Sequence, residues 1–377
     1  MTGRYNQRNY VRFGFFAAKE ATIGQVFRRA GYSTCIAGKW QLGGGMDAPN
    51  VAGFDDYCLW QLTRRGKTLG SRYPNPTLEQ NGKILEDLKG QYGPDVVSDF
   101  VVDFITKHKE RPFFVYYPMI LPHYPHEPTP NSADWDPNAA GLDVAHKIGT
   151  VRYFSDMVAY MDKTVGKVVD ALERNGLREN TLILFTGDNG THRGIVSEFR
   201  DGTITGGKGS MTDAGTHVPL IANWPDTVPA NKFLQDLVDF SDFLPTLCEV
   251  CGIERPAGQL DGQSFAPPLR GQPGRPREWV YSWYEREGRR DQARQFARTA
   301  RHKLYGDGRF YDVAADPLEQ KPLAAEKLSE EARKVRSELA AVLERMSSSD
   351  RDFASPAARL QSRPPDALPS RRASPRR

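Results

Sequence analysis

The sequence has no long apolar run, few cysteines and little excess of either charge, and each absence excludes a class of protein. None of its apolar stretches approaches the roughly 20 residues that a membrane-spanning helix needs. The net charge of +4 comes from the end of the chain, since residues 351–377 hold seven Arg and two Asp. The remaining residues therefore predict no basic face for nucleic acid and no membrane span.

Only four cysteines occur, and Cys248 and Cys251 form a C-x-x-C without the second pair that a zinc site requires. They lie in an apolar stretch that predicts a short helix, so we expect buried thiols, with a redox or metal role as the alternative. The N-terminus also lacks the charged and then apolar pattern of a signal peptide. The sequence therefore leaves the compartment unknown, and the oligomeric state with it.

The 377 residues suffice for one large domain and a smaller second one. With 26% charged and 11% aromatic residues, the chain has a globular composition. We expect an α/β domain over residues 1–254, a linker rich in Gly, Pro and Arg over 255–277, a small antiparallel subdomain with one helix over 278–346, and a disordered basic tail over 347–377.

Helices and strands alternate within the first 254 residues, and polar loops follow the strands. The first helix has clear ends, because Thr22 and Gln25 form a capping box and Gly31 is a C-terminal stop. This alternation predicts a mainly parallel sheet sandwiched by helices. The expected helices are 22–30, 94–108, 151–175 and 234–251, the expected strands 32–37, 112–120, 181–186 and 218–224, and the expected loops 46–90. In the subdomain we expect strands 279–284, 295–305 and 309–313 and a helix over 329–346.

The run Thr181–Thr186 has the uniform apolar character of a strand buried on both faces of a parallel sheet. Asp188 and Asn189 follow it directly, at the position where open α/β sheets bind ligands. A carboxylate and an amide oxygen suit a hard cation such as Ca²⁺ or Mg²⁺. An Asp-Asn-Gly sequence is also common in plain turns, which is the alternative.

Other loops bring further polar side chains to the same edge. Lys39 follows the strand at 32–37, His123 and His126 follow the strand at 112–120, and Lys208 lies in a Gly-Gly-Lys-Gly loop. Lysines and a divalent cation stabilise the charge that develops on a sulfate or phosphate ester. A histidine with an ordinary pKa of about 6.5 can protonate the leaving oxygen near neutral pH. The sequence therefore predicts a site for a tetrahedral oxyanion.

These loops resemble the motifs of the sulfatase family, within the alkaline-phosphatase-like superfamily. The resemblance covers nearly the whole ordered chain, and the matches occur in the family's order at fitting separations. They are Met1-Thr-Gly-Arg-Tyr, Gly31-Tyr32 with Gly38-Lys39-Trp40, Pro122-His123-Tyr124-Pro125, Thr186-Gly187-Asp188-Asn189-Gly190, Gly206-Gly207-Lys208-Gly209 with Val218-Pro219, and Tyr311-Asp312-Val313 with Asp316-Pro317-Leu318-Glu319.

The resemblance implies an alkaline-phosphatase-like fold and a role for each matching residue. Asp188 and Asn189 would be calcium ligands, with Mg²⁺ less expected. Lys39, His123 and Lys208 would be catalytic: the lysines bind sulfate oxygens, and the histidine contacts the sulfate or assists the leaving group. Gln41 stands where the family commonly has histidine; it can bind sulfate but supplies no proton at neutral pH. The remaining histidines would line the site (His126, His192) or be structural (His217, where the family usually has arginine).

One part of the family pattern is missing. Sulfatases use a formylglycine nucleophile, made from the first residue of C-x-P-S-R or S-x-P-S-R, and this motif stands before the segment that Met1-Thr-Gly-Arg resembles. The first strand, with two more acidic metal ligands, stands earlier still. We therefore expect a truncated, fragmentary or decayed sulfatase, with apolar surface uncovered at the front edge of its sheet.

Three functions remain open on these residues. The first is hydrolysis of aryl or carbohydrate sulfate esters, impaired because the formylglycine segment is absent. The second is phosphomonoester or phosphodiester hydrolysis in the same superfamily, whose sites typically hold two metals. The third is a non-catalytic, metal-supported anion-binding remnant. One pair of metal ligands and two lysines favour sulfate over phosphate, with a small-molecule or carbohydrate sulfate ester as partner.

Overall fold

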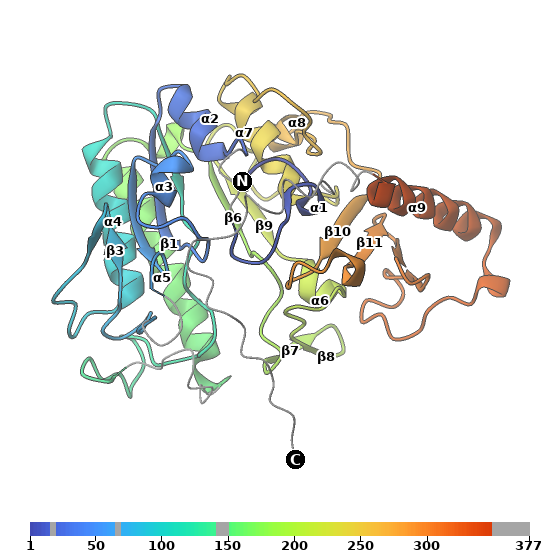
Figure 1. The fold of residues 1–377 in the computed structure, drawn as a ribbon, viewed down its shortest axis with the longest axis horizontal. Helices are drawn as coiled ribbons and strands as arrows, with labels where there is room; N and C mark the ends of the chain where they lie inside the picture. The colour runs from blue at the N-terminus through green and yellow to red at the C-terminus, as the bar shows by residue number, and fades with distance from the viewer. Residues whose placement is uncertain (16–19, 65–68, 141–150, 349–377) are drawn as a thin grey trace, which may run out of the picture.

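The computed structural model describes residues 1–15, 20–64, 69–140 and 151–348. An α/β domain occupies one side of the molecule, and a smaller antiparallel sheet with the long helix α9 (Glu330–Ser348) occupies the other (Figure 1). The disordered tail that the sequence predicts begins at residue 347 and lies almost entirely outside the described residues.

The main sheet is built around β1 (Ser33–Lys39), whose first six residues are buried. In the strand order β4-β3-β2-β1-β5, the strands on both sides of β1 are parallel to it: β2 (Asp56–Trp60) and β5 (Phe113–Tyr116). The short strands β3 (Glu79–Gln80) and β4 (Lys83–Ile84) add an antiparallel edge. The prediction of a mainly parallel sheet is confirmed for this core.

Helices cover both faces of β1, because its apolar side chains alternate between them. Cys35 and Ala37 pack with the side chains of two long helices, and Ile36 belongs to the cores on the opposite face. The first face carries α4 (Gly93–Lys107) and α5 (Phe154–Arg174), and the second carries α2 (Ile23–Arg29), α3 (Ala48–Val51) and α7 (Phe243–Val250).

Several predicted boundaries are wrong. Residues 46–90 are not only loops, because they contain α3 and the buried strand β2, whose five residues are flanked by turn-forming sequence. The single strand predicted over 295–305 is a hairpin of β11 (Arg294–Arg298) and β12 (His302–Tyr305). The helix predicted from residue 234 begins only at the 3-10 turn Phe240–Asp242, which leads into α7.

The strand β6 (Ile183–Thr186) does not pair with the main sheet. It pairs antiparallel with β9 (Leu220–Asn223), and all four of its residues are half-buried, so the prediction of a strand buried on both faces of a parallel sheet is wrong. A cavity of about 1990 Å³ is lined by β5, β6 and the apolar stripe of α5. A cavity with largely apolar walls therefore separates the β5 edge of the main sheet from β6.

The C-terminal sheet has the order β10-β11-β12-β13 and is antiparallel throughout, with β10 (Val280–Tyr284) and β13 (Phe310–Asp312) at its edges. Helix α9 packs on it through Leu339, Val342 and Leu343. The segment predicted as a linker includes the short helix α8 (Ala266–Leu269), and the N-terminal helix α1 (Asn6–Asn9) lies against β10.

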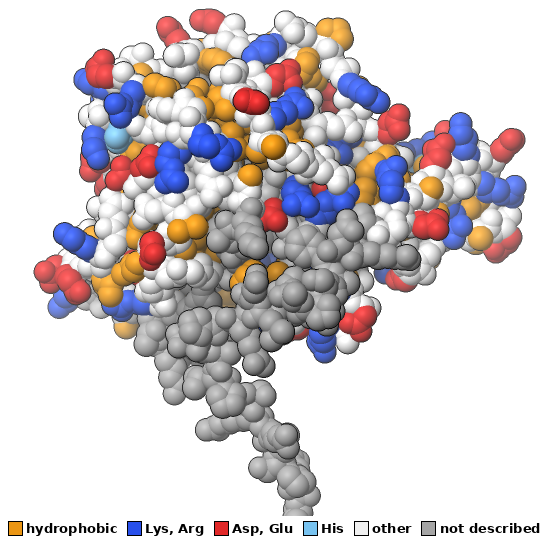
Figure 2. Space-filling model, turned by 45° about the horizontal axis from the view of Figure 1, so that its top comes forward, with side chains coloured by type: hydrophobic (Ala, Val, Ile, Leu, Met, Phe, Trp, Pro, Cys, Tyr) orange, Lys and Arg blue, Asp and Glu red, His pale blue; other side chains and the backbone are white. Residues whose placement is uncertain are grey.

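The surface shown in Figure 2 carries Lys and Arg interspersed with Asp and Glu, and no area of a single sign dominates this face. None of the described helices has both the length and the apolar character that crossing a membrane would require.

Candidate functional site

Lys39 and Asp188 mark the edge where the strands β1 and β6 end. The Nζ of Lys39 lies 3.7 Å from Oδ2 of Asp188, whose side chain is 70% exposed. Gly38 precedes the lysine with φ +118°, and a Cβ there would lie 2.1 Å from the carbonyl oxygen of Pro118. Glycine is therefore required for β1 to approach the segment after β5 so closely, and this contact fixes the direction in which Lys39 leaves the sheet.

His123 lies on the loop after β5 and contacts a buried arginine. The Nη1 of Arg72 is 2.7 Å from Nδ1 of His123, and the Arg72 guanidinium stacks 4.1 Å over the ring of Trp60. The carbonyl oxygen of Tyr124 also lies 2.5 Å from this Nδ1. A hydrogen bond to that carbonyl would need a proton on Nδ1, whereas the hydrogen bond from Arg72 needs Nδ1 without a proton. Because a guanidinium only donates and the charged bond is the stronger one, we assign the proton to Nε2.

The imidazole of His123 is neutral at physiological pH. Burial lowers its pKa most, and the positive charges of Lys208, Arg72 and Lys39 lower it further, to about 3. The sequence-based expectation of an ordinary histidine pKa is therefore wrong. In this surrounding, the ring has its proton on Nε2, where it is available for donation, and does not carry a second proton.

Lys208 is held on a tightly packed glycine loop. Its backbone N–H donates to the carbonyl of Thr191 at 2.9 Å. A Cβ at Gly206 would lie 2.2 Å from the carbonyl oxygen of His192, so the loop can pack against this segment only with glycine. Burial lowers the pKa of Lys208, Asp188 opposes this effect, and the nearby cations, Lys39, Arg72 and Arg286, lower the pKa further.

Most of the predicted residues converge on one cavity. Its lining includes Lys39, His123, Asp188, Asn189 and Lys208, but not Gln41. The backbone of Gln41 is left-handed, with φ +59°, at the turn that follows β1.

The sequence-based prediction missed Arg72 and Arg286. Arg72 comes from the loops after β2, and Arg286 comes from the C-terminal subdomain just after β10. Neither belongs to one of the matched motifs: Arg72 lies in the stretch predicted as loops, and Arg286 follows a strand of the subdomain, so no signal in the sequence distinguishes them from other arginines.

Two further histidines form an aromatic group beside His123. Tyr124 stacks on His192 with ring centroids 4.5 Å apart, and both line the cavity. His126 lies behind them, 1% exposed, and neither of its ring nitrogens has a hydrogen-bond partner. Burial, with His192 nearby, lowers the pKa of His126 to about 4. His126 is therefore a neutral packing element, whereas His192 is open to a ligand.

The remaining candidates are not part of this aromatic group, although His217 and Cys251 also line the cavity. The side chain of His217 is 74% exposed, with Nδ1 3.9 Å from a carboxylate oxygen of Asp213. Cys248 is buried, but Cys251 is exposed, so the expectation of two buried thiols is wrong for the second. Both are free thiols, as are Cys35 and Cys58.

The oxygen donors at the cavity are too few for a calcium site. Ca²⁺ takes about six to eight oxygen ligands, and Asp188 and Asn189 offer a carboxylate and an amide. Among the described residues, no group of three or more His, Cys, Asp or Glu side chains is placed to hold a metal ion. The residues present therefore do not by themselves fit the cation.

The fold and the site together define an α/β protein with cationic side chains gathered at the carboxyl ends of its parallel strands. The sulfatase family model matches residues 1–253, and a model of the C-terminal region of N-sulphoglucosamine sulphohydrolase matches residues 207–349. The first match covers well over half of the sequence. The chain belongs to the sulfatase family.

Its relatives include arylsulfatases and a carbohydrate sulfatase. The chain is 28% identical to human arylsulfatase A, over 81% of this chain and 62% of that protein. It is 30% identical to mouse arylsulfatase G, over 72% and 58%, and 27% identical to N-acetylgalactosamine-6-O-sulfatase of Bacteroides thetaiotaomicron, over 56% and 52%. The chain thus spans about three fifths of the length of arylsulfatase A.

Solved structures share the fold. Ps i-CgsB in complex with k-i-k-neocarrahexaose superposes with a TM-score of 0.72 at 24% identity, over 93% of this chain and 81% of that one. A protein in complex with its substrate D-glucosamine-2-N,6-O-disulfate superposes with a TM-score of 0.70 at 19% identity, over 94% and 87%. At these identities the likeness establishes the α/β architecture.

Proposed function

We propose that the rim of β1, β5 and β6 binds the sulfate group of an aryl or carbohydrate sulfate ester, as part of sulfuric ester hydrolysis. The observation that carries this proposal is the convergence of Lys39, Arg72 and Lys208 around the neutral His123. One carboxylate, Asp188, faces these cations. Such a group attracts a compact anion strongly, because the cations are partly shielded from water.

Each residue has a distinct task in this proposal. Lys39 and Lys208 bind oxygens of the sulfate as mobile point charges. His123 donates from Nε2, and Arg72 fixes that tautomer through its contact with Nδ1. Because the pKa of His123 is so low, this residue stabilises a sulfate oxygen as a neutral donor and does not act as an acid of ordinary pKa.

Two parts of the reaction remain proposals from the family resemblance. Asp188 and Asn189 would contribute two ligands to a divalent cation, fewer than such an ion takes. The 377 residues contain no C-x-P-S-R or S-x-P-S-R from which a formylglycine could form. We therefore expect these residues to bind sulfate and to hydrolyse sulfate esters negligibly, since nucleophilic catalysis needs a nucleophile.

A phosphoesterase is the second candidate, because phosphate has the same tetrahedral shape. Sites of that kind typically place two metals beside the ester, and the described residues gather no group of three or more acidic, His or Cys ligands. Lysines in place of a second metal favour a sulfate ester. The choice is testable by competition between the two anions.

The experiment is isothermal titration calorimetry of potassium sulfate into the 377-residue chain, with and without CaCl₂. Lys208→Ala should weaken binding on the order of tenfold or more, since it removes one charged donor. The matched control is Lys83→Ala, which removes an exposed lysine on β4. Equal affinity of Lys208→Ala and wild type would overturn the proposal.

A parallel assay separates the candidate functions by turnover. Release of a chromophore from an aryl sulfate and from the matching aryl phosphate is followed with the same protein. Tighter binding of inorganic phosphate than sulfate, together with turnover of the phosphate ester, would replace the sulfatase proposal by the phosphoesterase one. Robust turnover of the aryl sulfate would contradict the expectation of negligible hydrolysis and keep the substrate class.

A further inference from the structure

Residues 206–215 form the loop that carries Lys208. This loop is hydrogen-bonded both to the α/β domain and to the C-terminal subdomain. On the α/β side, its backbone joins the segment after β6: Lys208 N–H donates to Thr191 at 2.9 Å, and the carbonyl of Gly215 accepts from Gly190 N–H at 2.9 Å. Gly206 N–H donates to Ile195 at 2.8 Å. Arg193 also donates to the carbonyl of Lys208 at 2.9 Å, so these bonds hold residues 206–208 and Gly215 to the rim but not the residues between them.

The middle of the loop is held by the C-terminal subdomain. Arg294 of β11 donates to the carbonyl of Gly209 at 3.0 Å. The hydroxyl of Tyr305, on β12, lies 3.1 Å from the carbonyl of Met211. The backbone N–H of Asp213, the first residue of α6 (Asp213–Thr216), donates to Glu319 at 2.7 Å. Gly209, Met211 and Asp213 are therefore hydrogen-bonded to residues of the C-terminal subdomain.

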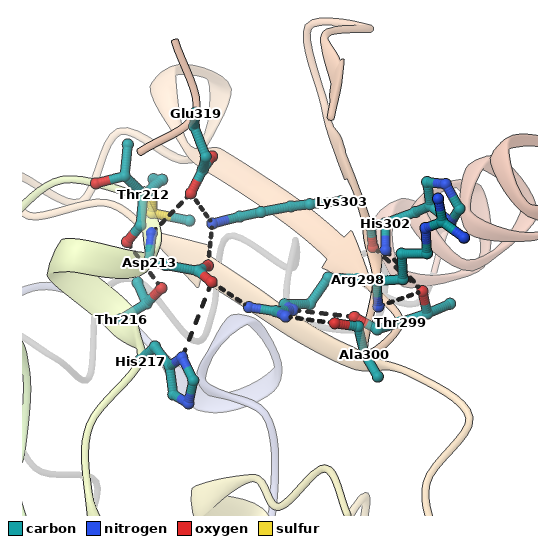
Figure 3. Close-up of polar contacts among 12 residues, drawn as sticks. Thr212, Asp213, Thr216, His217, Arg298, Thr299, Ala300, His302, Lys303 and Glu319 are labelled. Atoms are coloured by element: carbon teal, nitrogen blue, oxygen red, sulfur yellow. Dashed lines mark hydrogen bonds and ion pairs between the residues drawn. The ribbon is translucent and has the colours of Figure 1, made fainter. Parts of the chain in front are cut away.

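A buried ion cluster completes this attachment (Figure 3). The side chain of Lys303 is 0% exposed, and its Nζ lies 3.0 Å from the carboxylate of Asp213 and 2.9 Å from that of Glu319. Arg298 forms an ion pair with the other oxygen of Asp213. Two cations thus meet two carboxylates, and the charges balance in a largely buried region, where Asp213 and Arg298 keep 16% and 11% exposure.

The balance of charges keeps Asp213 ionised. Burial alone would raise its pKa, but Lys303 and Arg298 together hold it below the usual value. A charged Asp213 is needed for the geometry, because a neutral carboxyl would leave Lys303 paired only with Glu319. The cluster therefore fixes α6 in one position relative to β11 and β12.

We infer that Asp213, Arg298, Lys303 and Glu319 are positioning residues that hold Lys208 at the anion site from the C-terminal sheet. The inference rests on the proposed function, since it assigns these residues to the orientation of a sulfate-binding lysine. Lys208 stands five positions before Asp213 in the sequence. Misplacement of a binding group by a small distance weakens its contribution strongly, so release of the loop should be measurable as lost sulfate affinity.

The test compares Lys303→Met with Arg301→Gln as the matched control. Arg301 precedes the same strand, is exposed, and pairs with Asp312 away from the loop. Lys303→Met should bind potassium sulfate roughly five- to tenfold more weakly than wild type, whereas Arg301→Gln should not change the affinity. In a Lys208→Ala background, Lys303→Met should cause no further loss. A residue that only stabilises the fold would lower Tm in both backgrounds without this dependence on Lys208.

Arg294→Gln serves as a second variant if Lys303→Met does not fold, because Arg294 is exposed and loses its hydrogen bond to the loop together with a cation–π contact to Tyr284 on the neighbouring strand. Hydrogen–deuterium exchange of residues 206–215 is measured alongside and should increase in both variants but not in Arg301→Gln. Unchanged sulfate affinity in a folded Lys303→Met or Arg294→Gln, with Lys208→Ala still weakened, would overturn the inference alone. Unchanged affinity in Lys208→Ala would overturn the proposed function, and the exchange data would then decide whether the attachment of the loop stands.

Discussion

Two lysine–carboxylate groups in this molecule use the same chemistry in opposite surroundings. Lys39 meets Asp188 at 3.7 Å across the rim of the cavity, and the carboxylate is 70% exposed. Lys303 meets Asp213 and Glu319 at 3.0 and 2.9 Å beside the C-terminal sheet, and its own side chain is fully buried. The first pair has room for a third, anionic partner, and the second does not.

The difference shows how one residue type serves binding in one region and architecture in another. An exposed pair contributes little to folding, because water solvates both ions well. A buried pair must be complete, because each ion left alone keeps its full cost of desolvation. The open group, Lys39 with Asp188, is therefore suited to exchange its partner for a ligand. The closed group, Lys303 with Asp213 and Glu319, is suited to hold a loop in place.

The largest effect is expected from a substitution that disrupts the closed group. Lys303→Met should lower the free energy of unfolding by about 3–5 kcal/mol, since it leaves two buried carboxylates with one cation. Lys39→Met should change it by less than about 1 kcal/mol. Urea denaturation followed by circular dichroism measures both. Equal losses in the two variants would contradict the distinction between the groups.

The comparison of buried and exposed groups extends to the histidines and to pH. The pKa of His126 is about 4 in the folded protein, below the unfolded value of about 6.5, so the unfolded state binds more protons between these values. The contribution of His126 to the free energy of unfolding is therefore fully present above about pH 6.5. It is lost as the pH falls, by roughly 2 kcal/mol between pH 7 and pH 5.

Denaturation curves at several pH values measure this slope in His126→Phe and in the control His217→Gln. His126→Phe should flatten the slope, because it removes the titrating ring while keeping an aromatic packing element. His217→Gln should leave it unchanged, since that side chain is exposed. A slope that is the same in wild type and His126→Phe would assign the pH dependence to other groups.

A smaller effect is expected at the open group. Lys39→Met should weaken sulfate binding on the order of tenfold, which is about 1.4 kcal/mol, because one charged donor is lost and the fold is kept. Calorimetry with potassium sulfate measures it. Asp188→Asn should instead strengthen sulfate binding, since it removes the carboxylate that pairs with Lys39. A weaker sulfate affinity in this variant would argue that Asp188 supports the anion and does not compete with it.

The smallest effect concerns the cation. The 377-residue chain should bind Ca²⁺ weakly, because Asp188 and Asn189 supply too few oxygen ligands, and Asp188→Ala should abolish most of that affinity. Titration with CaCl₂, with MgCl₂ as a comparison, measures this directly. Tight, calcium-selective binding would mean that other oxygen donors complete the site.

The sequence determined the rim of the site. Lys39, His123, Asp188 and Lys208 each stand after a strand or in a glycine loop, and the apolar pattern was enough to predict that these segments meet, although β6 reaches the cavity from a separate two-stranded sheet. The capping box at Thr22 and the order of helices and strands were also local features. Patterns of this kind are decided by neighbouring residues, and a single sequence contains them.

Only the tertiary structure decided what surrounds that rim. Arg72 contacts His123 from 51 residues away, and Lys303 holds Asp213 from 90 residues away. The pKa of His123 and the half-buried state of β6 likewise depend on side chains brought together by folding. Electrostatic interactions and burial depend on distance in space, which the spacing of residues along the chain does not specify.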